Sequence, residues 1–330
     1  MCPPWVGTLI FTFLPQTSVT HGHICNHKGN QTQNTMLAPN PFRQEYATDQ
    51  DDKQLIAEAL KGSKTSLEKL LRKHQPFIYN VAWKMVANPA DAQDITQEAM
   101  IKVITNLSKF EGRSEFRTWL YRIVVNHFLQ MKKQSRETVV NEDFSNFAHV
   151  LDGIADEELT ELEQNEMLEE IREMNLACMS GMLLCFTREQ RLVYILGELF
   201  NADHTIGAEI LGLTKANFRV RLSRARKDLS QFMNNKCGLV NKNNPCRCYK
   251  KVTAMINAQR IDSKNLLFNN KAYASFKQYI ANDADEMLDL IDEKRRQLHD
   301  DFPYKQDFDR KTLLTNLLNN EQLARLMNLN

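Results

Sequence analysis

The sequence predicts an all-α protein with two helical domains, an acidic segment between them and a helical C-terminal extension. Apolar residues recur at steps of three and four along several segments, which is the period of an α-helix with one buried face. Only 11 glycines and 9 prolines occur among the 330 residues, well below average usage. No strand-like alternation of useful length interrupts the helical patterns.

Composition narrows the class of protein. The net charge is +1, the mean hydropathy is −0.47, and no apolar run approaches the ~20 residues of a membrane span. We therefore expect a cytoplasmic chain that does not associate with membranes, with two or three domains. Residues 1–45 are predicted to be a disordered or mis-assigned leader, because the apolar run from Trp5 to Leu14 lacks the basic flank of a signal peptide and Met36 is an alternative start.

A helix-turn-helix is predicted near the middle of the chain. A short helix begins near Asp203 and ends at Gly212, a residue suited to a tight turn. Thr214 is placed to cap the next helix, which Phe218 anchors at the start of an apolar stripe. Ala208 supplies the small residue expected where the two helices cross. The motif is common among DNA-binding proteins and does not by itself define the function of the protein.

The second helix of this motif carries a donor-rich face opposite its apolar stripe. Arginine offers paired donors to phosphate and guanine, and asparagine can pair with adenine. A solvated charged face is the simpler alternative. The predicted DNA-binding residues of this helix are Lys215, Asn217, Arg219, Arg221, Arg224 and Arg226.

A second basic segment lies at residues 108–136. Ser114 is expected to cap a helix whose apolar stripe includes His127, which we interpret as packed rather than catalytic. Basic residues beside an exposed aromatic side chain suit a surface that holds phosphates and stacks on unpaired bases, although Trp119 could equally belong to the core. The predicted DNA-binding residues here are Arg113, Arg117, Trp119, Arg122, Asn126, Lys132 and Lys133.

An acidic, amide-bearing face precedes this segment. Asn88-Pro89 is expected to end one helix and Asp91 to cap the next, whose buried line continues to Leu107. The opposite face is either solvated surface or a dock for a basic protein partner. Its residues are Asp91, Asp94, Gln97 and Glu98.

Two stretches together resemble the sigma-70 family of bacterial RNA polymerase sigma factors, and in particular its extracytoplasmic-function group. Region 2 of that family is similar to DAQDITQEAMIKVITNLSKFEGRSEFRTWLYRIVVN, and region 4 is similar to FTREQRLVYILGELFNADHTIGAEILGLTKANFRVRLSRARKDL. Order and spacing agree, and the resemblance covers roughly residues 52–235. It implies a factor that directs promoter-specific initiation, with core polymerase and promoter DNA as partners, and no enzyme activity.

The resemblance also implies roles for the surfaces described above. The acidic face at Asp91–Glu98 corresponds to the surface of such factors that binds the clamp of the largest polymerase subunit. Residues 110–136 correspond to the part that melts and reads the −10 element, and residues 215–226 to the helix that enters the −35 element. This chain departs from the family where that helix begins, reading KANFRVR in place of a common Thr-Val pair. The preferred −35 sequence therefore does not follow from the resemblance.

Five segments result. Residues 1–45 are the leader, 52–136 region 2, 137–177 an acidic linker, 178–235 region 4 and 236–330 the extension. Region 4 starts with a scaffold helix for which Thr187 and Gln190 have capping-box spacing. From Asn141 to Asn175 the linker holds twelve Asp or Glu residues and the single Arg172, a composition typical of a solvated segment. The resemblance implies that it threads toward the polymerase active centre.

Three cysteines follow the recognition helix in a basic loop, Cys237, Cys246 and Cys248. A soft metal ion such as zinc, a redox-active pair and ordinary packing all stay open, because three thiols do not complete a four-ligand site. Cys178 and Cys185 are interpreted as buried thiols. The rest of the extension reads as helices, with Met287, Leu288, Ile291 and Leu298 on one side of one of them.

Two other functions compete with the sigma-factor interpretation. An ordinary helix-turn-helix regulator would bind duplex DNA without polymerase. Such a regulator does not require the motif EFRTWLYRIVVN beside DITQEA, both of which are present here. A metal- or redox-sensing interaction protein would depend on the cysteine tail. No cofactor is required for the sigma function, and an anti-sigma or sensor protein is a further expected partner.

Overall fold

In the computed structural model the described residues are 40–44, 46, 49–271, 273–275, 297–299, 301–305, 310–321 and 325, so the predicted leader lies almost wholly outside them. Their regular structure is helical apart from a pair of two-residue strands, which confirms the all-α prediction. Residues 38–330 form one compact unit. No described helix is long and apolar enough to span a bilayer.

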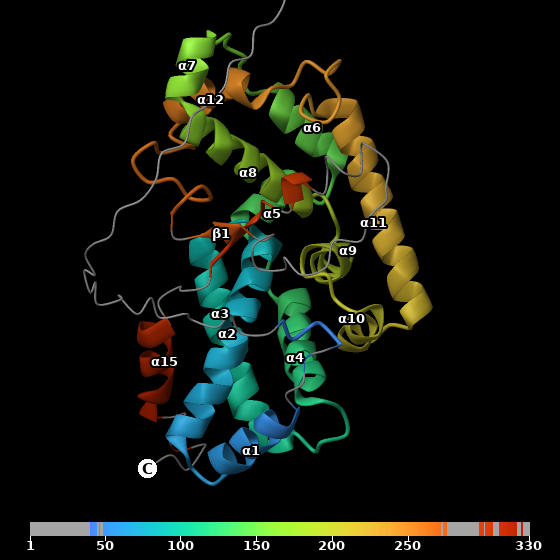
Figure 1. Ribbon diagram of the computed structural model, residues 1–330, viewed down its shortest axis with the longest axis vertical. Helices are drawn as coiled ribbons and strands as arrows, with labels where there is room; N and C mark the ends of the chain where they lie inside the picture. The colour runs from blue at the N-terminus through green and yellow to red at the C-terminus, as the bar shows by residue number, and fades with distance from the viewer. Residues whose placement is uncertain are drawn as a thin grey trace, which may run out of the picture. The chain divides into compact units, whose positions relative to one another are not determined.

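The predicted region 2 is a group of packed helices (Figure 1). The helix α2 packs against α1 and α3, and α4 packs against α3. The predicted buried line of α3 is confirmed, since Ile95, Ala99, Val103 and Leu107 are all at most 5% exposed. The bounds are Asp49–Leu60 for α1, Lys64–Val86 for α2, Pro89–Asn106 for α3, Leu107–Lys109 for the 3₁₀ turn η1 and Phe116–Gln130 for α4.

Two predicted helix caps are wrong by one to three residues. Asn88, not Asp91, caps α3, and its Oδ1 accepts hydrogen bonds from the amides of Ala90 and Asp91 at 2.9 and 3.3 Å. Pro89 has no amide hydrogen to satisfy and so favours the first helical position, which leaves the cap to the residue before it. Glu115 occupies the N-cap position of α4, but its side chain makes no capping hydrogen bond. The hydroxyl of Ser114 donates a hydrogen bond to the backbone carbonyl of Glu115 instead.

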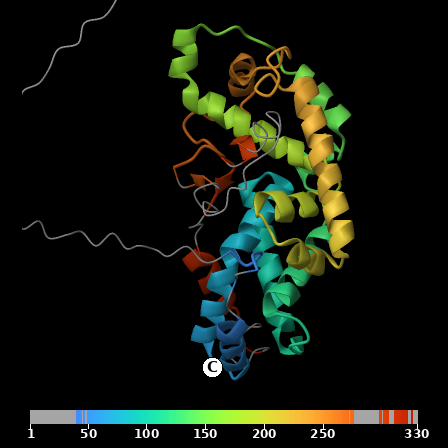
Figure 2. The same cartoon turned by 45° about the vertical axis from the view of Figure 1, so that its right-hand side comes forward.

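The helix-turn-helix forms as predicted. Thr187 and Gln190 make the capping box, and Gly212 ends α10 in the left-handed conformation. The two helices approach closely at Gly207, where an added Cβ would lie 2.7 Å from the Phe218 ring, and the neighbouring Ala208 is buried. The bounds are Arg188–Tyr194 for α9, Ile195–Leu199 for the π-helical turn η2, His204–Leu211 for α10 and Lys215–Lys236 for α11, which lies beside α9 and α10 in Figure 2.

The acidic segment contains helices, and between residues 152 and 169 it is exposed or half-buried, including the whole of α7, in agreement with a solvated segment or exposed helix. Two of its carboxylates pair with lysines at the start of the later helix α12, Cys248–Asn257. Asp156 accepts a bond from Lys251 at 2.8 Å, and Glu158 pairs with Lys250. Cationic partners from a later part of the chain thus reduce the repulsion that the acidic composition alone would produce. The bounds are Ser135–Val140 for α5, Phe144–Asp152 for α6, Glu161–Glu166 for α7 and Leu168–Leu184 for α8.

A buried charge network joins the start of the predicted acidic linker to region 4. Glu137 of α5 is fully buried and accepts bonds from Arg188 at 2.8 Å and from Arg191 at 2.8 Å. Arg191 is also fully buried and donates to the carbonyls of Leu184 and Phe186. Burial acts to raise the pKa of Glu137, but the bonds from both arginines lower it overall. The network therefore holds an ionised carboxylate in the core.

The C-terminal extension completes the packing of α2. Trp83 stacks on Phe268 with ring centroids 5.8 Å apart and on Tyr273 at 4.7 Å. Asn80 exchanges two bonds with the backbone of Lys305. The predicted helix face at Met287, Leu288 and Ile291 lies outside the described residues. The bounds are Cys248–Asn257 for α12, Ala274–Ser275 for β1, Pro303–Tyr304 for β2, which pairs antiparallel with β1, and Arg310–Leu318 for α15.

Candidate nucleic-acid and polymerase interfaces

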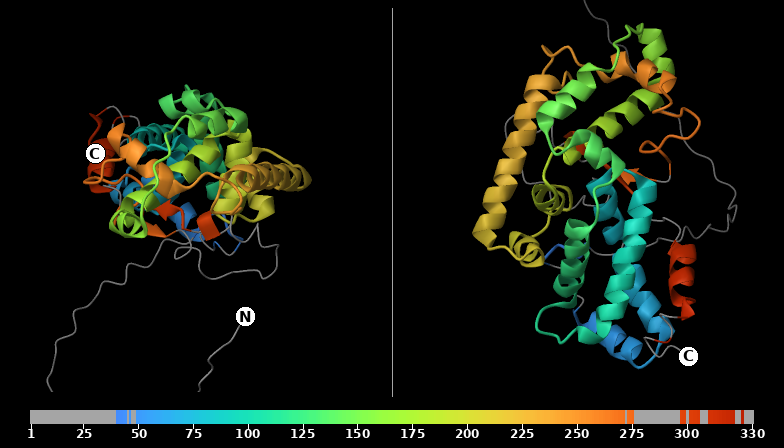
Figure 3. Two further views of the ribbon diagram at one scale, coloured as in Figure 1. Left: turned by 90° about the horizontal axis from the view of Figure 1, so that it is seen from above. Right: turned by 180° about the vertical axis from the view of Figure 1, so that it is seen from behind.

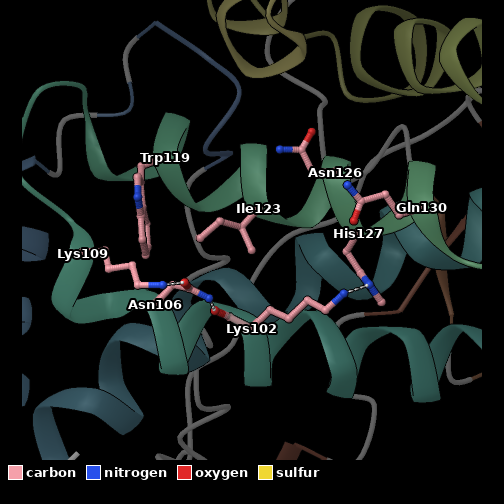
Figure 4. A pocket seen from close by; sticks show the side chains of 8 residues that line it. All are labelled: Lys102, Asn106, Lys109, Trp119, Ile123, Asn126, His127 and Gln130. Carbon is pink, nitrogen blue, oxygen red and sulfur yellow. Dashed lines mark hydrogen bonds between the residues drawn. The ribbon is translucent and has the colours of Figure 1, made fainter.

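A groove of about 280 Å³ runs between α3 and α4. Figure 4 shows Trp119 and Ile123 reaching from α4 toward α3, with Lys102 and Asn106 facing them. Its lining combines one aromatic ring, two lysines and several amides. The lining residues are Lys102, Asn106, Lys109, Trp119, Ile123, Asn126, His127 and Gln130.

Trp119 is half-buried, which resolves the question whether it is core or surface. Its ring packs against Phe116 with centroids 5.7 Å apart and against Phe110 at 5.4 Å, so its position is held from one side. The remaining surface of the indole lines the groove. A fixed aromatic face beside lysines is the arrangement on which an unpaired base can stack while its phosphate is neutralised.

His127 is packed, as expected, and is also one of the residues that line the groove. It is 4% exposed, and its Nδ1 lies 2.7 Å from Lys102 Nζ. Burial, followed by the charge of Lys102, lowers the pKa of His127. A neutral imidazole then accepts a hydrogen bond from the lysine and fixes it at the edge of the groove. Lys109 is held similarly, since its Nζ donates to Asn106 Oδ1 at 2.9 Å.

The other predicted residues of this segment divide into two groups. Arg113, Arg122, Asn126, Lys132 and Lys133 are exposed, although Lys133 also pairs with Glu142 at 3.2 Å. Arg117 is buried at 6% exposure and donates to the carbonyl of Arg43 at 2.7 Å. We therefore withdraw Arg117 from the DNA-contacting set, because it anchors residues 41–43 against α4.

The four predicted polymerase-binding residues share one face of α3. Asp94 and Glu98 are exposed, and Asp91 and Gln97 are half-buried. Burial and then the charge of Asp94 raise the pKa of Asp91. Glu98 is one helical turn before Lys102, so the acidic face continues directly into the basic groove. A protein partner bound on this face would lie beside nucleic acid held in the groove.

The basic face of α11 is partly organised by its own scaffold. Arg226 donates to the largely buried Glu198 at 2.6 Å, Arg219 donates to His204 Nδ1 at 3.2 Å, and Arg221 donates to Asn217 Oδ1 at 3.1 Å. Lys215, Asn217 and Arg224 are exposed. The apolar stripe of the helix is buried from Phe218 to Leu229, which leaves these polar side chains facing outward.

Arg224 and Arg226 are expected to respond differently to alanine substitution. Losing a base-reading contact at Arg224 should cost about 1–3 kcal/mol and relax sequence preference, whereas losing a phosphate contact at Arg226 should weaken all sequences and flatten the salt dependence by about one unit. Promoter fragments carrying altered −35 sequences, titrated with the chain bound to core polymerase at several salt concentrations, measure both effects. Identical behaviour of the two variants would refute this division of labour.

Sequence reasoning predicted only Trp119 and Asn126 of the eight groove residues as binding residues. Lys102, Asn106, Lys109 and Gln130 are drawn from α3, η1 and α4, and no local pattern joins them. The only sequence signal is that Lys102 and Asn106 lie four residues apart, and therefore on one helix face. Their common function depends on how α3 and α4 pack.

Comparison with known proteins agrees with this geometry. Residues 70–138, which include α3 and α4, match the family Sigma-70 region 2. The chain is 39% identical over 79 residues to the RNA polymerase sigma-H factor of Pseudomonas aeruginosa, which is 24% of this chain and 41% of that protein. The matches to the first two relatives span 41% and 40% of those proteins, about two fifths of their length.

Longer matches cover about half of the chain. RNA polymerase sigma factor YlaC of Bacillus subtilis is 27% identical over 173 residues, which cover 51% of this chain and 92% of that protein. The ECF RNA polymerase sigma-E factor of Escherichia coli is 28% identical over 181 residues, which cover 53% of this chain and 91% of that protein. The groove and the acidic face lie within the residues that match region 2. Residues 70–138 therefore carry a sigma-70 region 2 domain, and the relatives that this chain resembles over about half of its length are RNA polymerase sigma factors, among them one of the extracytoplasmic-function group.

Proposed function

We propose that the chain binds core RNA polymerase and directs promoter-specific initiation of transcription. The observation that carries this proposal is the continuity of the acidic face of α3 with the groove between α3 and α4. A partner with a basic surface would seat on Asp94 and Glu98, next to nucleic acid in the groove. The clamp of the largest polymerase subunit is the proposed partner. Control by an anti-sigma or sensor protein stays a prediction from the sequence.

The groove is the proposed site for an unpaired base of the −10 element. A base leaving the duplex would stack on Trp119, while Asn126 and Gln130 offer amide groups to its edge. Lys102 and Lys109 neutralise the backbone phosphates at the groove. The work is capture and positioning of a melted strand, so no catalytic residue is needed.

The helix α11 is the proposed reader of the −35 element. Elements named −10 and −35 are 25 base pairs apart, about 85 Å of duplex at 3.4 Å per pair. In this structure α10 contacts both α4 and α11, and α11 is only about 33 Å long at 1.5 Å per residue (Figure 3). We infer that regions 2 and 4 separate when the chain binds polymerase and promoter together.

Run-off transcription with core polymerase tests the proposal, with Trp119→Ala and Trp119→Phe compared. Loss of base stacking is worth about 1–3 kcal/mol, so the alanine variant should form roughly 5- to 150-fold less open complex, whereas the phenylalanine variant keeps most activity. Permanganate reactivity of promoter thymines reports melting directly. Thermal unfolding checks that both variants are folded.

Two results would contradict the proposal. Full open-complex formation by folded Trp119→Ala would remove the groove from strand capture. Specific binding of duplex DNA by the chain alone, without any stimulation of core polymerase, would instead favour an ordinary helix-turn-helix regulator.

A further inference from the structure

Four cysteines from three separate parts of the chain meet beside the end of the recognition helix. Cys237 is the C-cap residue of α11, and an isolated parallel β-bridge pairs it with Cys246. Cys248 is the first residue of α12. Cys178 lies in the second half of α8, against which α12 packs. The fold therefore adds a fourth thiol to the three that are close in sequence.

The four thiols are close enough to influence one another. Cys248 packs in a cluster with Met174, which is one turn before Cys178 on α8. Burial is the main cause that raises the pKa of Cys178 and Cys248, the latter to about 12, and the charges of Cys237 and Cys246 raise both further. All four are free thiols.

We propose that Cys178, Cys237, Cys246 and Cys248 are the ligands of one Zn²⁺ ion that joins α8, the end of α11 and the start of α12. Four cysteines are a common ligand set of structural zinc, and soft thiolates favour it over oxygen-preferring cations. Among the described residues, no three His, Cys, Asp or Glu side chains are already set at metal-binding geometry. The site therefore forms by rotation of cysteine side chains, each of which has one χ1 rotor, as the thiols release their protons to the solvent.

The surroundings suit a zinc site with four thiolates, which carries a net charge of −2. Lys251 and Lys236 lie near enough to Cys246 for their charges to act on its thiol, and Arg247 acts likewise on Cys248. Lys251 is itself 6% exposed and held by the carbonyl of Ile154 at 2.9 Å.

Metal analysis of the full chain, purified with reductant and Zn²⁺, tests the site without any need for transcription. We expect one zinc per chain, and in the Co²⁺-loaded chain the intense thiolate-to-cobalt absorption of a tetrahedral site. Cys178→Ser should lose the bound metal or weaken its binding at least tenfold. Cys185→Ser is the matched control, because Cys185 is a buried thiol at the C-cap of the same helix, about two turns after Cys178, and is not one of the four proposed ligands; this variant should keep one zinc.

Alkylation of the wild-type chain keeps the test decisive if Cys178→Ser does not fold. Peptide mapping should show the four proposed ligands protected with zinc and labelled after a chelator is added, with Cys185 unchanged by the chelator. Wild type that retains no zinc, a folded Cys178→Ser with a full equivalent and an unaltered cobalt spectrum, or a Cys237–Cys246 disulfide in the reductant-purified chain would each overturn the proposal.

Discussion

Charge reversal at both Asp94 and Glu98 to lysine is expected to abolish binding of the chain to core RNA polymerase. Both carboxylates are exposed on one face of α3, and Glu98 is 67% exposed. Opposing like charges across an interface cost several kcal/mol, so we expect at least a roughly 100-fold loss of affinity. Co-purification with core polymerase gives the qualitative result, and fluorescence titration gives the change in Kd.

A control variant with the same change in net charge distinguishes loss of the docking face from a general effect of charge on polymerase binding. Glu161 and Glu166 are exposed on α7, away from the groove, and their double replacement by lysine alters the charge equally. This variant should bind core as the wild type does. Wild-type affinity of the Asp94/Glu98 reversal, with an intact melting curve, would show that α3 is not the docking face.

Replacing Glu137 with glutamine should lower the free energy of unfolding by about 3–5 kcal/mol. The substitution leaves Arg188 and Arg191 buried without a counter-charge, and breaking a buried ion pair from one side has a cost of this size. Arg191 is 0% exposed, so water cannot replace the lost partner. Urea unfolding followed by circular dichroism measures the change.

Glu68→Gln is the matched control for Glu137. Glu68 and its partner Arg72 are 35% and 40% exposed, and such exposed pairs contribute about 0–1 kcal/mol. The pKa of Glu137 is lowered in the folded chain, so the stability that its charge provides is present above its unfolded pKa, near 4.3, and is lost as the pH falls through the folded pKa. The gap between wild type and Glu137→Gln should therefore narrow in acid. Equal effects of the two glutamine variants at neutral pH would contradict the role of the network.

Much of the helical scaffold and the candidate interfaces could be predicted from the sequence because their determinants are local. A capping box spans four residues, as at Thr187 and Gln190, and a helix-ending glycine such as Gly212 acts within one turn. The apolar stripe of α11 and the acidic face of α3 follow from a period of 3.6 residues. Errors at this level were small, such as the cap of α3 at Asn88 in place of Asp91.

The sequence by itself determined the helix periods, most caps and the surfaces that carry charge, because these depend on neighbours within a few residues. Only the tertiary structure decided which charges are buried and with which partners. Arg117 bonds Arg43 across 74 residues, Arg188 bonds Glu137 across 51, and Lys251 bonds Asp156 across 95. The groove between α3 and α4, and the grouping of Cys178 with the other three thiols, likewise depend on tertiary packing. Desolvation and pairing depend on distance in space, and no periodicity along the chain encodes which distant segments meet.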